Sequence, residues 1–231
     1  MSDCVLGVIG GMGPYATAKF IENITKHTKA SKDQEHLNMV VLNHCSMPDR
    51  TETIMSGEKE ELLTHFKEAL KILEFANVDA ISIPSNTSHY FINDIQEMTN
   101  IPIINMIDET CKYITENYSG KEIVVLATQG TIKSRIYEKY AKKWGIKIKS
   151  LTENQEKIVM DTIYDMKNKK IIESPTFNQL VYGFMKEDLL VVFACTELSS
   201  LELPDAMEGH IVDAMTVLMK ESVERCGKEW I

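Results

Sequence analysis

The sequence lacks long apolar runs and has no excess of basic residues. No stretch approaches the roughly 18 consecutive apolar residues that a membrane span requires, so we expect no transmembrane helix and no membrane partner. The formal net charge is -9 at pH 7, which argues against a nucleic-acid partner because phosphate binding requires a basic stripe. A small anionic ligand remains compatible with this charge, since nearby cations dominate the field inside a cleft.

Paired cysteines are also missing. The 5 cysteines are odd in number and show no CxxC spacing, which argues against a disulfide framework or a zinc site and favours a reducing compartment. At most one or two of them should be reactive. The amino terminus, Met1-Ser2-Asp3-Cys4, has no basic region and leads into a short apolar run, so it does not resemble a secretory signal. We therefore expect a cytoplasmic location.

Short apolar runs alternate with helical patterns along the whole chain, which is typical of strands joined by crossover helices in a parallel sheet. The predicted strands cover residues 5–9, 38–42, 80–84, 103–106, 122–127, 146–149 and 189–194. The predicted helices begin at Pro14 and near Asn86 and Thr87, and cover residues 60–76, 131–144, 153–169 and 213–226. The fold class is therefore α/β, and 231 residues suffice for one large domain or two small ones.

Similar stretches in the two halves of the sequence suggest a duplicated subdomain. Residues 9–14 follow a strand and open a helix, as do residues 127–131, and each is followed about 65 to 75 residues later by a strand that ends at Ser85 or Cys195. Open parallel sheets bind ligands beyond the carboxyl ends of their strands, so two facing halves would place Ser85 and Cys195 across one cleft. We expect a first subdomain of residues 1–100 plus about 208–231, onto which the last helix folds back, and a second of residues 101–207.

Two apolar strands run directly into reactive side chains. One ends in Cys195-Thr196-Glu197 and the other in Ser85-Asn86-Thr87. A thiol between a strand and a helix start can have a lowered pKa and act as a base or nucleophile, whereas an inert buried cysteine is the other interpretation. Ser85 at the matching place favours a functional role.

The remaining candidates are less specific. Gly10-Gly11-Met12-Gly13 either lets backbone amides approach an anion or forms a tight strand-to-helix turn, and it lacks the full fingerprint of a nucleotide site. Arg50 either grips a substrate carboxylate or is a solvated loop charge, and the same alternatives hold for Lys167. The 6 histidines show no metal-binding spacing, so we expect no metal ion and give them no catalytic role.

Four stretches together carry a resemblance to a known family: Gly10 to Thr17, Pro48-Asp49-Arg50-Thr51, Ser85-Asn86-Thr87-Ser88-His89 and Cys195-Thr196-Glu197-Leu198. They resemble the opening loop, the carboxylate-binding loop and the two catalytic tips of the aspartate/glutamate racemase family, the cofactor-independent amino-acid racemases. The match extends over nearly the whole chain. The resemblance implies two similar α/β subdomains, each a parallel sheet flanked by helices, with the active site in the cleft between them. It also implies a homodimer that uses neither pyridoxal phosphate nor a metal.

The same resemblance implies roles for individual residues. In the family, one cysteine at each tip removes the α-proton of an amino acid or returns it on the opposite face, so it implies that Ser85 and Cys195 are catalytic. The implied substrate is aspartate or glutamate. The implied substrate-binding residues are Met12, Asp49, Arg50, Thr51, Asn86, Thr87, Thr128, Lys167, Thr196 and Glu197.

The chain departs from the family pattern at Ser85, where a cysteine is expected. An aliphatic hydroxyl is a far weaker acid than a thiol, so we expect slow or one-sided racemisation. Loss of one cysteine also leaves open a single-cysteine relative that decarboxylates or isomerises a dicarboxylate. A third alternative is a non-catalytic amino-acid-binding homologue.

Overall fold

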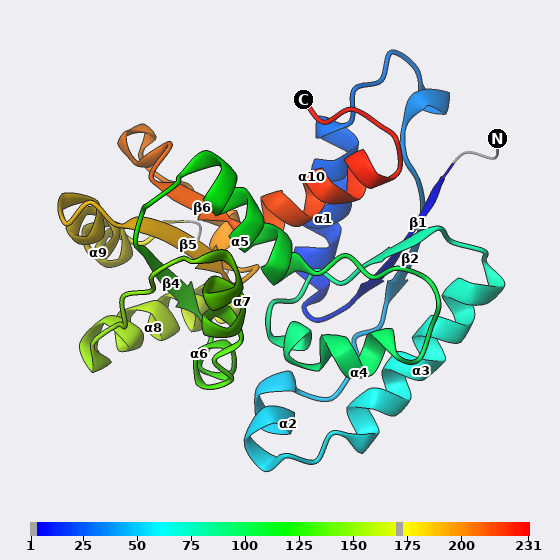
Figure 1. Cartoon of the computed structure of the whole chain (residues 1–231), viewed down its shortest axis with the longest axis horizontal. Helices are drawn as coiled ribbons and strands as arrows, with labels where there is room; N and C mark the ends of the chain where they lie inside the picture. Colours follow the sequence, from blue (N-terminus) through cyan, green and yellow to red (C-terminus); the bar gives the residue numbers. More distant parts are fainter. Residues whose placement is uncertain (1–3, 170–172) are drawn as a thin grey trace. The chain divides into compact units, whose positions relative to one another are not determined.

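The chain folds into two compact units, described by a computed structural model that covers residues 4–169 and 173–231 (Figure 1). One unit comprises Met1–Met106 with Leu218–Ile231, and the other comprises Ile107–Val217. Each is built on a three-stranded parallel sheet flanked by helices, which confirms the predicted α/β class with two subdomains. The boundaries predicted at residues 100 and 207 remain a proposal for the domain organisation.

The first unit has the strand order β2-β1-β3. Its strands are β1 (Val5–Gly10), β2 (Asn38–Asn43) and β3 (Ala80–Ser82). The central strand β1 is almost wholly buried, as expected for an apolar run that is covered on both faces. Its helices are α1 (Pro14–His27), η1 (Asp33–Glu35), α2 (Arg50–Ser56), α3 (Glu60–Phe75), η2 (Thr87–Phe91) and α4 (Ile92–Gln96).

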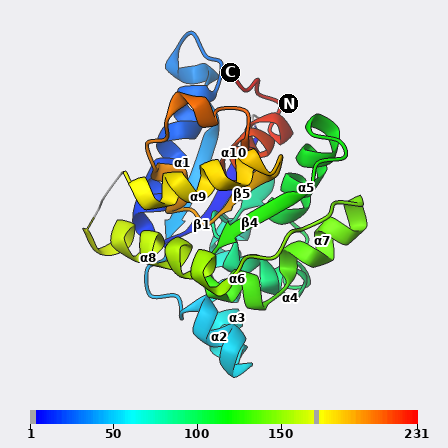
Figure 2. The ribbon, with the colours of Figure 1, turned by 90° about the vertical axis from the view of Figure 1, so that its left-hand side faces the viewer.

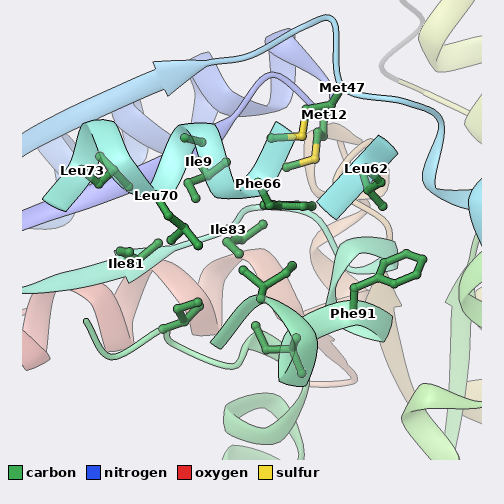
Figure 3. Packing of buried hydrophobic residues seen from close by; sticks show 14 of the residues in the cluster. Ile9, Met12, Met47, Leu62, Phe66, Leu70, Leu73, Ile81, Ile83 and Phe91 are labelled. Atoms are coloured by element: carbon green, nitrogen blue, oxygen red, sulfur yellow. The ribbon is translucent and has the colours of Figure 1, made fainter. Parts of the chain in front are cut away.

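An apolar core joins α3 to this sheet (Figure 3). Leu62, Phe66, Leu70 and Leu73 recur at helical spacing and present one buried face of α3. That face packs with Ile9 and Ile81 and with other buried residues of the same cluster. The cluster also contains Met12 and Met47, which lie in the loops that follow β1 and β2.

The second unit has the strand order β4-β5-β6. Its strands are β4 (Ile123–Ala127), β5 (Leu190–Ala194) and β6 (Ile211–Asp213). Alternate residues of β4 and β5 belong to two different apolar clusters, so both faces of the sheet are buried. The helices are α5 (Met106–Asn117), α6 (Gln129–Lys133), α7 (Ile136–Trp144), α8 (Glu153–Lys169), α9 (Pro175–Lys186), η3 (Leu198–Ser200) and η4 (Asp205–Met207).

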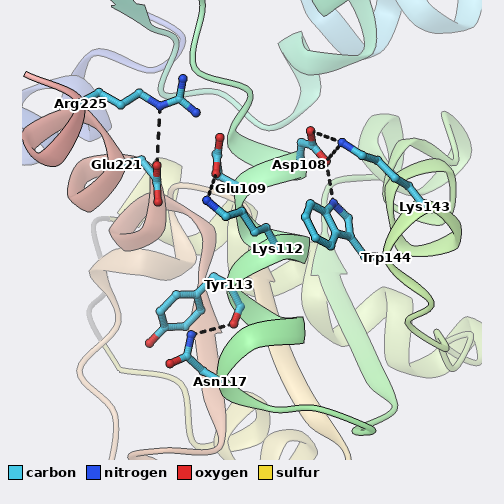
Figure 4. Close-up of polar contacts among 9 residues, drawn as sticks. All are labelled: Asp108, Glu109, Lys112, Tyr113, Asn117, Lys143, Trp144, Glu221 and Arg225. Atoms are coloured by element: carbon cyan, nitrogen blue, oxygen red, sulfur yellow. Dashed lines mark hydrogen bonds and ion pairs between the residues drawn. The ribbon is translucent and has the colours of Figure 1, made fainter.

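Packing against strands and hydrogen bonds between helices hold these helices in place. Helix α8 contacts β4, and α9 contacts β5 (Figure 2). On α5, the carboxylate of Asp108 accepts hydrogen bonds from Lys143 Nζ at 2.7 Å and from Trp144 Nε1 at 2.7 Å (Figure 4). Both donors lie at the end of α7, so Asp108 ties α5 to α7.

Several elements differ from the sequence-based expectations. The helix predicted over residues 131–144 is broken into α6 and α7, because Arg135 adopts a left-handed conformation with φ 53° that a continuous helix cannot contain. Residues 103–106 and 146–149 make isolated parallel bridges, Ile81 with Ile103 and Ile123 with Ile148, instead of full strands. Helix α9 and strand β6 were not predicted, and the residues of β6 include the first residue of the predicted last helix.

The carboxyl-terminal residues Leu218–Ile231 belong to the first unit. Helix α10 (Ala214–Arg225) carries Ser222, whose hydroxyl lies 2.6 Å from that of Ser82 on β3. Both side chains are fully buried. Further along, Thr28 and Trp230 form an antiparallel bridge. No helix within the described part of the chain is both long and apolar enough to cross a membrane.

Helix α3 offers a matched test of this packing. Phe66 is 0% exposed and Phe75, on the same helix, is 89% exposed. We expect Phe66→Ala to lower the free energy of unfolding by about 3–5 kcal/mol, because it removes buried area and leaves a cavity. We expect Phe75→Ala to change it by less than about 0.5 kcal/mol. Urea denaturation followed by circular dichroism measures both, and similar losses in the two variants would contradict the described packing.

Candidate active site

The Ser85 tip lies directly beyond β3 in the first unit and is tightly turned. The N–H of Ser85 donates to the carbonyl of Ile83 at 2.7 Å, and the hydroxyl of Ser88 donates to Ser85 Oγ at 2.8 Å. The carbonyl of Ser85 lies 2.8 Å from Nδ1 of His89. Backbone and side chain of Ser85 are therefore both held by residues of the turn that follows it.

The glycine loop after β1 is a tight turn packed against the loop after β2. Gly11 has φ +90°, and a Cβ atom there would lie 2.4 Å from the backbone of His44, so only glycine fits. The N–H of Gly11 donates to Thr17 Oγ1 at 2.8 Å. The structure therefore supports the turn interpretation for Gly11. Met12 is buried, and its sulfur lies 3.3 Å from Ser88 Oγ.

Arg50 is the first residue of α2 and is half-buried. Its Nη1 donates to the carbonyl of Pro48 at 3.0 Å, and its Nη2 lies 3.5 Å from the carbonyl of Met12. Carbonyl oxygens have no net charge, so these two contacts position the guanidinium without neutralising it. Asp49 caps α2, because its carboxylate accepts from the N–H of Glu52 at 2.9 Å.

The other candidates of the first unit surround these loops. Thr51 lies in the first turn of α2 and is half-buried. Asn86 and Thr87 begin η2, directly after Ser85. Asn86 occupies the N-cap position but makes no side-chain capping bond. The first unit thus gathers every predicted residue from Met12 to Thr87 at the carboxyl ends of its strands.

Cys195 lies directly beyond β5 in the second unit and is 5% exposed. Its thiol donates to Oε2 of Glu197 at 2.9 Å. Burial raises the pKa of Cys195 well above its ordinary value, the negative charge of Glu197 adds to this increase, and Lys167 opposes it. A position between a strand and a helix start can lower the pKa of a thiol, but at Cys195 desolvation outweighs that effect. The resting side chain is a thiol.

Glu197 is the centre of a small charged network. Besides the thiol of Cys195, its carboxylate receives the hydroxyl of Thr196 at 3.4 Å. Its other oxygen lies 3.5 Å from Nζ of Lys167 on α8. The sequence assigned Glu197 to substrate binding, whereas this geometry makes it the proton acceptor closest to the thiol among the described contacts. Glu197 can therefore take the proton of Cys195 when a thiolate is needed.

Thr128 shares the same edge of the second sheet. Ala127 and Ala194 are paired in parallel register, so the residues that follow them, Thr128 and Cys195, both emerge at the carboxyl ends of adjacent strands. The hydroxyl of Thr128 accepts from the N–H of Thr131 at 3.4 Å and caps α6. The second unit thus gathers Thr128, Lys167, Cys195, Thr196 and Glu197 around one sheet edge.

The sequence interpretation missed one polar residue in each unit, Ser88 in the first and Asp213 in the second. Ser88 belonged to a quoted motif, but its bond to Ser85 could not be read from the sequence. Asp213 ends β6 and accepts from Ser199 Oγ at 2.7 Å and Thr216 Oγ1 at 3.0 Å, and burial raises its pKa. The sequence signal that could have identified Asp213 is its position directly after the apolar pair Ile211-Val212.

The described residues, 4–169 and 173–231, contain no group of three or more His, Cys, Asp or Glu side chains that could hold a metal ion. The four cysteines other than Cys195 differ in how well solvent reaches their thiols. Burial raises the pKa of Cys111 to about 12 and also raises that of Cys226. Cys4 is half-buried. Cys45 is exposed, so it is the thiol most open to solvent.

Comparison with known proteins identifies a family. The model of the Asp/Glu/hydantoin racemase family matches residues 9–221. The broad specificity amino-acid racemase RacX of Bacillus subtilis is 28% identical over 95% of this chain and 96% of its own length. An aspartate racemase of Picrophilus torridus is 28% identical with a TM-score of 0.85, covering 99% of this chain and 96% of that one. The glutamate racemase of Campylobacter jejuni shares the fold, with 18% identity, a TM-score of 0.62 and coverage of 98% and 88%.

Substitutions of the two charged residues in this network, Glu197 and Lys167, should shift the pKa of Cys195 in opposite directions. Removing the charge of Glu197 by Glu197→Gln should lower the pKa of Cys195, whereas Lys167→Met should raise it. Lys157→Met is the control, because Lys157 lies on the same helix but pairs with Asp161. The pH dependence of iodoacetamide labelling of the Cys195 peptide, followed by mass spectrometry, measures the shift. Shifts in the same direction for both variants would contradict the network.

Proposed function

Since the chain belongs to the Asp/Glu/hydantoin racemase family, we propose that it interconverts the L and D forms of aspartate or glutamate without a cofactor. Ser85 and Cys195 act on opposite faces of the substrate α-carbon. The single observation that carries this proposal is the hydrogen bond of 2.9 Å between the Cys195 thiol and Glu197, because it pairs a potential carbon base with a group that can take its proton.

Abstraction begins at Cys195. Transfer of the thiol proton to Glu197 leaves a thiolate, which removes the α-proton from one face of the substrate and becomes a thiol again. Glu197 then releases its proton to solvent. The guanidinium of Arg50 binds a substrate carboxylate, and cations close to that carboxylate stabilise the negative charge that develops as the proton leaves. Lys167 beside Glu197 reduces the cost of the network's negative charge.

Reprotonation takes place at Ser85. A hydroxyl is a poor base but an adequate proton donor to a carbanion. The hydroxyl of Ser88 donates to Ser85 Oγ, so the hydroxyl proton of Ser85 points away from Ser88 and can be donated to the substrate. The same bond stabilises negative charge on Ser85 Oγ as its proton departs, and a solvent proton then restores the hydroxyl. Because the two tips differ in acidity, kcat should differ between the L and D substrates, whereas kcat/KM must be equal for both because enantiomers have equal free energies.

The similarity to relatives supports amino acids as the substrates and a homodimer as the assembly. The Picrophilus torridus relative is an aspartate racemase and the Bacillus subtilis relative a broad specificity amino-acid racemase, so other amino acids belong in the substrate panel. The family resemblance also supports a cytoplasmic homodimer, whose mass light scattering measures directly.

A second candidate reaction is favoured by one observation. Cys195 is held as a thiol by burial, which suits a single-cysteine decarboxylase that protonates the carbanion left after loss of carbon dioxide from a malonate. Release of carbon dioxide from a substituted malonate, without exchange of amino-acid α-protons, would favour this reaction over racemisation.

The racemase proposal is tested in deuterium oxide with each enantiomer of aspartate and glutamate. We expect Cys195→Ala to reduce both α-proton exchange and racemisation by about 10²–10⁴-fold, the usual contribution of a general acid or base. Ser85→Ala should retain exchange at the Cys195 face and lose racemisation. Ser85→Cys should raise kcat/KM for both enantiomers, because a thiol is the stronger acid.

Proton NMR follows exchange, and chiral chromatography follows racemisation. Exchange that survives Cys195→Ala would remove Cys195 from the mechanism. Binding of the amino acids, seen as thermal stabilisation without any exchange, would instead identify a non-catalytic binding protein.

A further inference from the structure

His89 is a fully buried histidine whose ring joins two segments of the first unit. Its Nδ1 atom lies 2.8 Å from the carbonyl oxygen of Ser85. Its Nε2 atom lies 3.0 Å from the backbone nitrogen of Met106. Met106 begins α5 and is also where the longer segment of the first unit ends. The ring therefore connects the Ser85 tip to the point at which the chain leaves this unit.

The two partners determine the protonation state of the ring. A backbone N–H only donates, so Nε2 must present its lone pair to Met106. A carbonyl oxygen only accepts, so Nδ1 must carry the proton. Protonation of Nε2 would replace the bond from Met106 by a 3.5 Å approach to the carbonyl of Ile104. Burial also lowers the pKa of His89, so the neutral Nδ1–H form is the one that satisfies both partners.

The bond to Ser85 fixes the direction of a peptide group. The peptide between Ser85 and Asn86 is trans, so its C=O and N–H point in opposite directions. Because the carbonyl points to the buried ring of His89, the N–H of Asn86 points away from it. Rotation of this peptide would turn the Ser85 carbonyl and the backbone N–H of Asn86 together, and the turn that carries the Ser85 side chain would lose one of its bonds. His89 therefore fixes the backbone of Ser85 and Asn86, two residues assigned to the site.

The segment around Met106 is held from both sides. The N–H of Ile104 donates to the carbonyl of Ile81 at 2.8 Å, next to β3. His89 then accepts from Met106 two residues later. Without the ring, the buried carbonyl of Ser85 and the buried N–H of Met106 would each lose a hydrogen bond, and the loss of a buried hydrogen bond is costly. The tip and the start of α5 are therefore supported by one side chain.

We propose that His89 is a positioning residue: its neutral imidazole holds Ser85 in the orientation in which the hydroxyl delivers a proton to the substrate. The proposal rests on the racemase function proposed for this chain. His89 is fully buried and contacts the backbone carbonyl of Ser85, so it acts through the Ser85 backbone.

The first test examines the hydrogen bonds of His89 in the unmodified protein. Nitrogen NMR of protein labelled in its histidine rings, with His89 assigned by the loss of its signals in His89→Gln, reports which ring nitrogen carries the proton. We expect a protonated Nδ1 and an unprotonated Nε2 from about pH 8 down to about pH 5, below the ordinary pKa of histidine. A proton on Nε2, or titration at the ordinary pH, would overturn the proposal.

The second test separates positioning from general stability. The amide of His89→Asn can replace the Nδ1–H donor to Ser85, whereas the carbonyl oxygen of His89→Gln can replace only the Nε2 acceptor for Met106. Exchange of the α-proton at the Cys195 face does not need Ser85, but racemisation does. We expect His89→Gln to lower the ratio of racemisation to exchange by about 10- to 100-fold, the effect of a small misplacement of a reacting group, and His89→Asn to lower it less. His210→Gln, at an exposed histidine, is the control and should leave the ratio unchanged.

Equal losses of exchange and racemisation in both His89 variants would show a purely structural role and overturn the proposal. If the unmodified protein exchanges no amino-acid α-proton, the racemase function itself fails. The position of the ring proton then still decides whether His89 holds the Ser85 tip, because that measurement requires no turnover.

Discussion

Parallel strands that are buried on both faces leave polar chemistry only at their ends. In the second unit, successive residues of β4 and β5 point into two separate apolar clusters, so a charged side chain within either strand would lose its hydration. The first polar groups appear where these strands stop, at Thr128 and Cys195. The same constraint in the first unit puts Ser85 beyond β3. The position of the site residues thus follows from how the sheets are covered.

This constraint explains which features could be predicted from the sequence. An apolar run followed at once by Cys195-Thr196-Glu197 is a local pattern, and the strand, its end and the polar tip are all contained in it. The same holds for Ser85-Asn86-Thr87 and for Pro14 at the start of α1. These predictions depend on neighbouring residues alone, and the elements appear within a few residues of the expected bounds.

The features that could not be predicted depend on contacts between distant residues. The break between α6 and α7 requires a left-handed Arg135, which nothing in a pattern of good helix formers indicates. Strand β6 has only three residues and exists because Val191 to Phe193 pair with it. The bond from Met106 to His89 spans a sequence separation of 17. The direction of the pKa shift of Cys195 could not be predicted, because the burial that raises it depends on the whole unit, whereas the helix start that favours a thiolate is local.

The two tips are controlled by different physical means. At Cys195 the geometry is set by charges: a carboxylate at 2.9 Å and a lysine beyond it, so proton transfer there depends on the electrostatic balance of the network. At Ser85 the described support is neutral: the hydroxyl of Ser88 and the uncharged ring of His89. A thiol needs a nearby base to become a thiolate, so charge is useful at Cys195. A hydroxyl that donates its proton only to a carbanion gains little from a nearby carboxylate, and its contribution depends on the direction in which its proton points. Hydrogen bonds that orient Ser85 are therefore the form of control that suits a serine at this position.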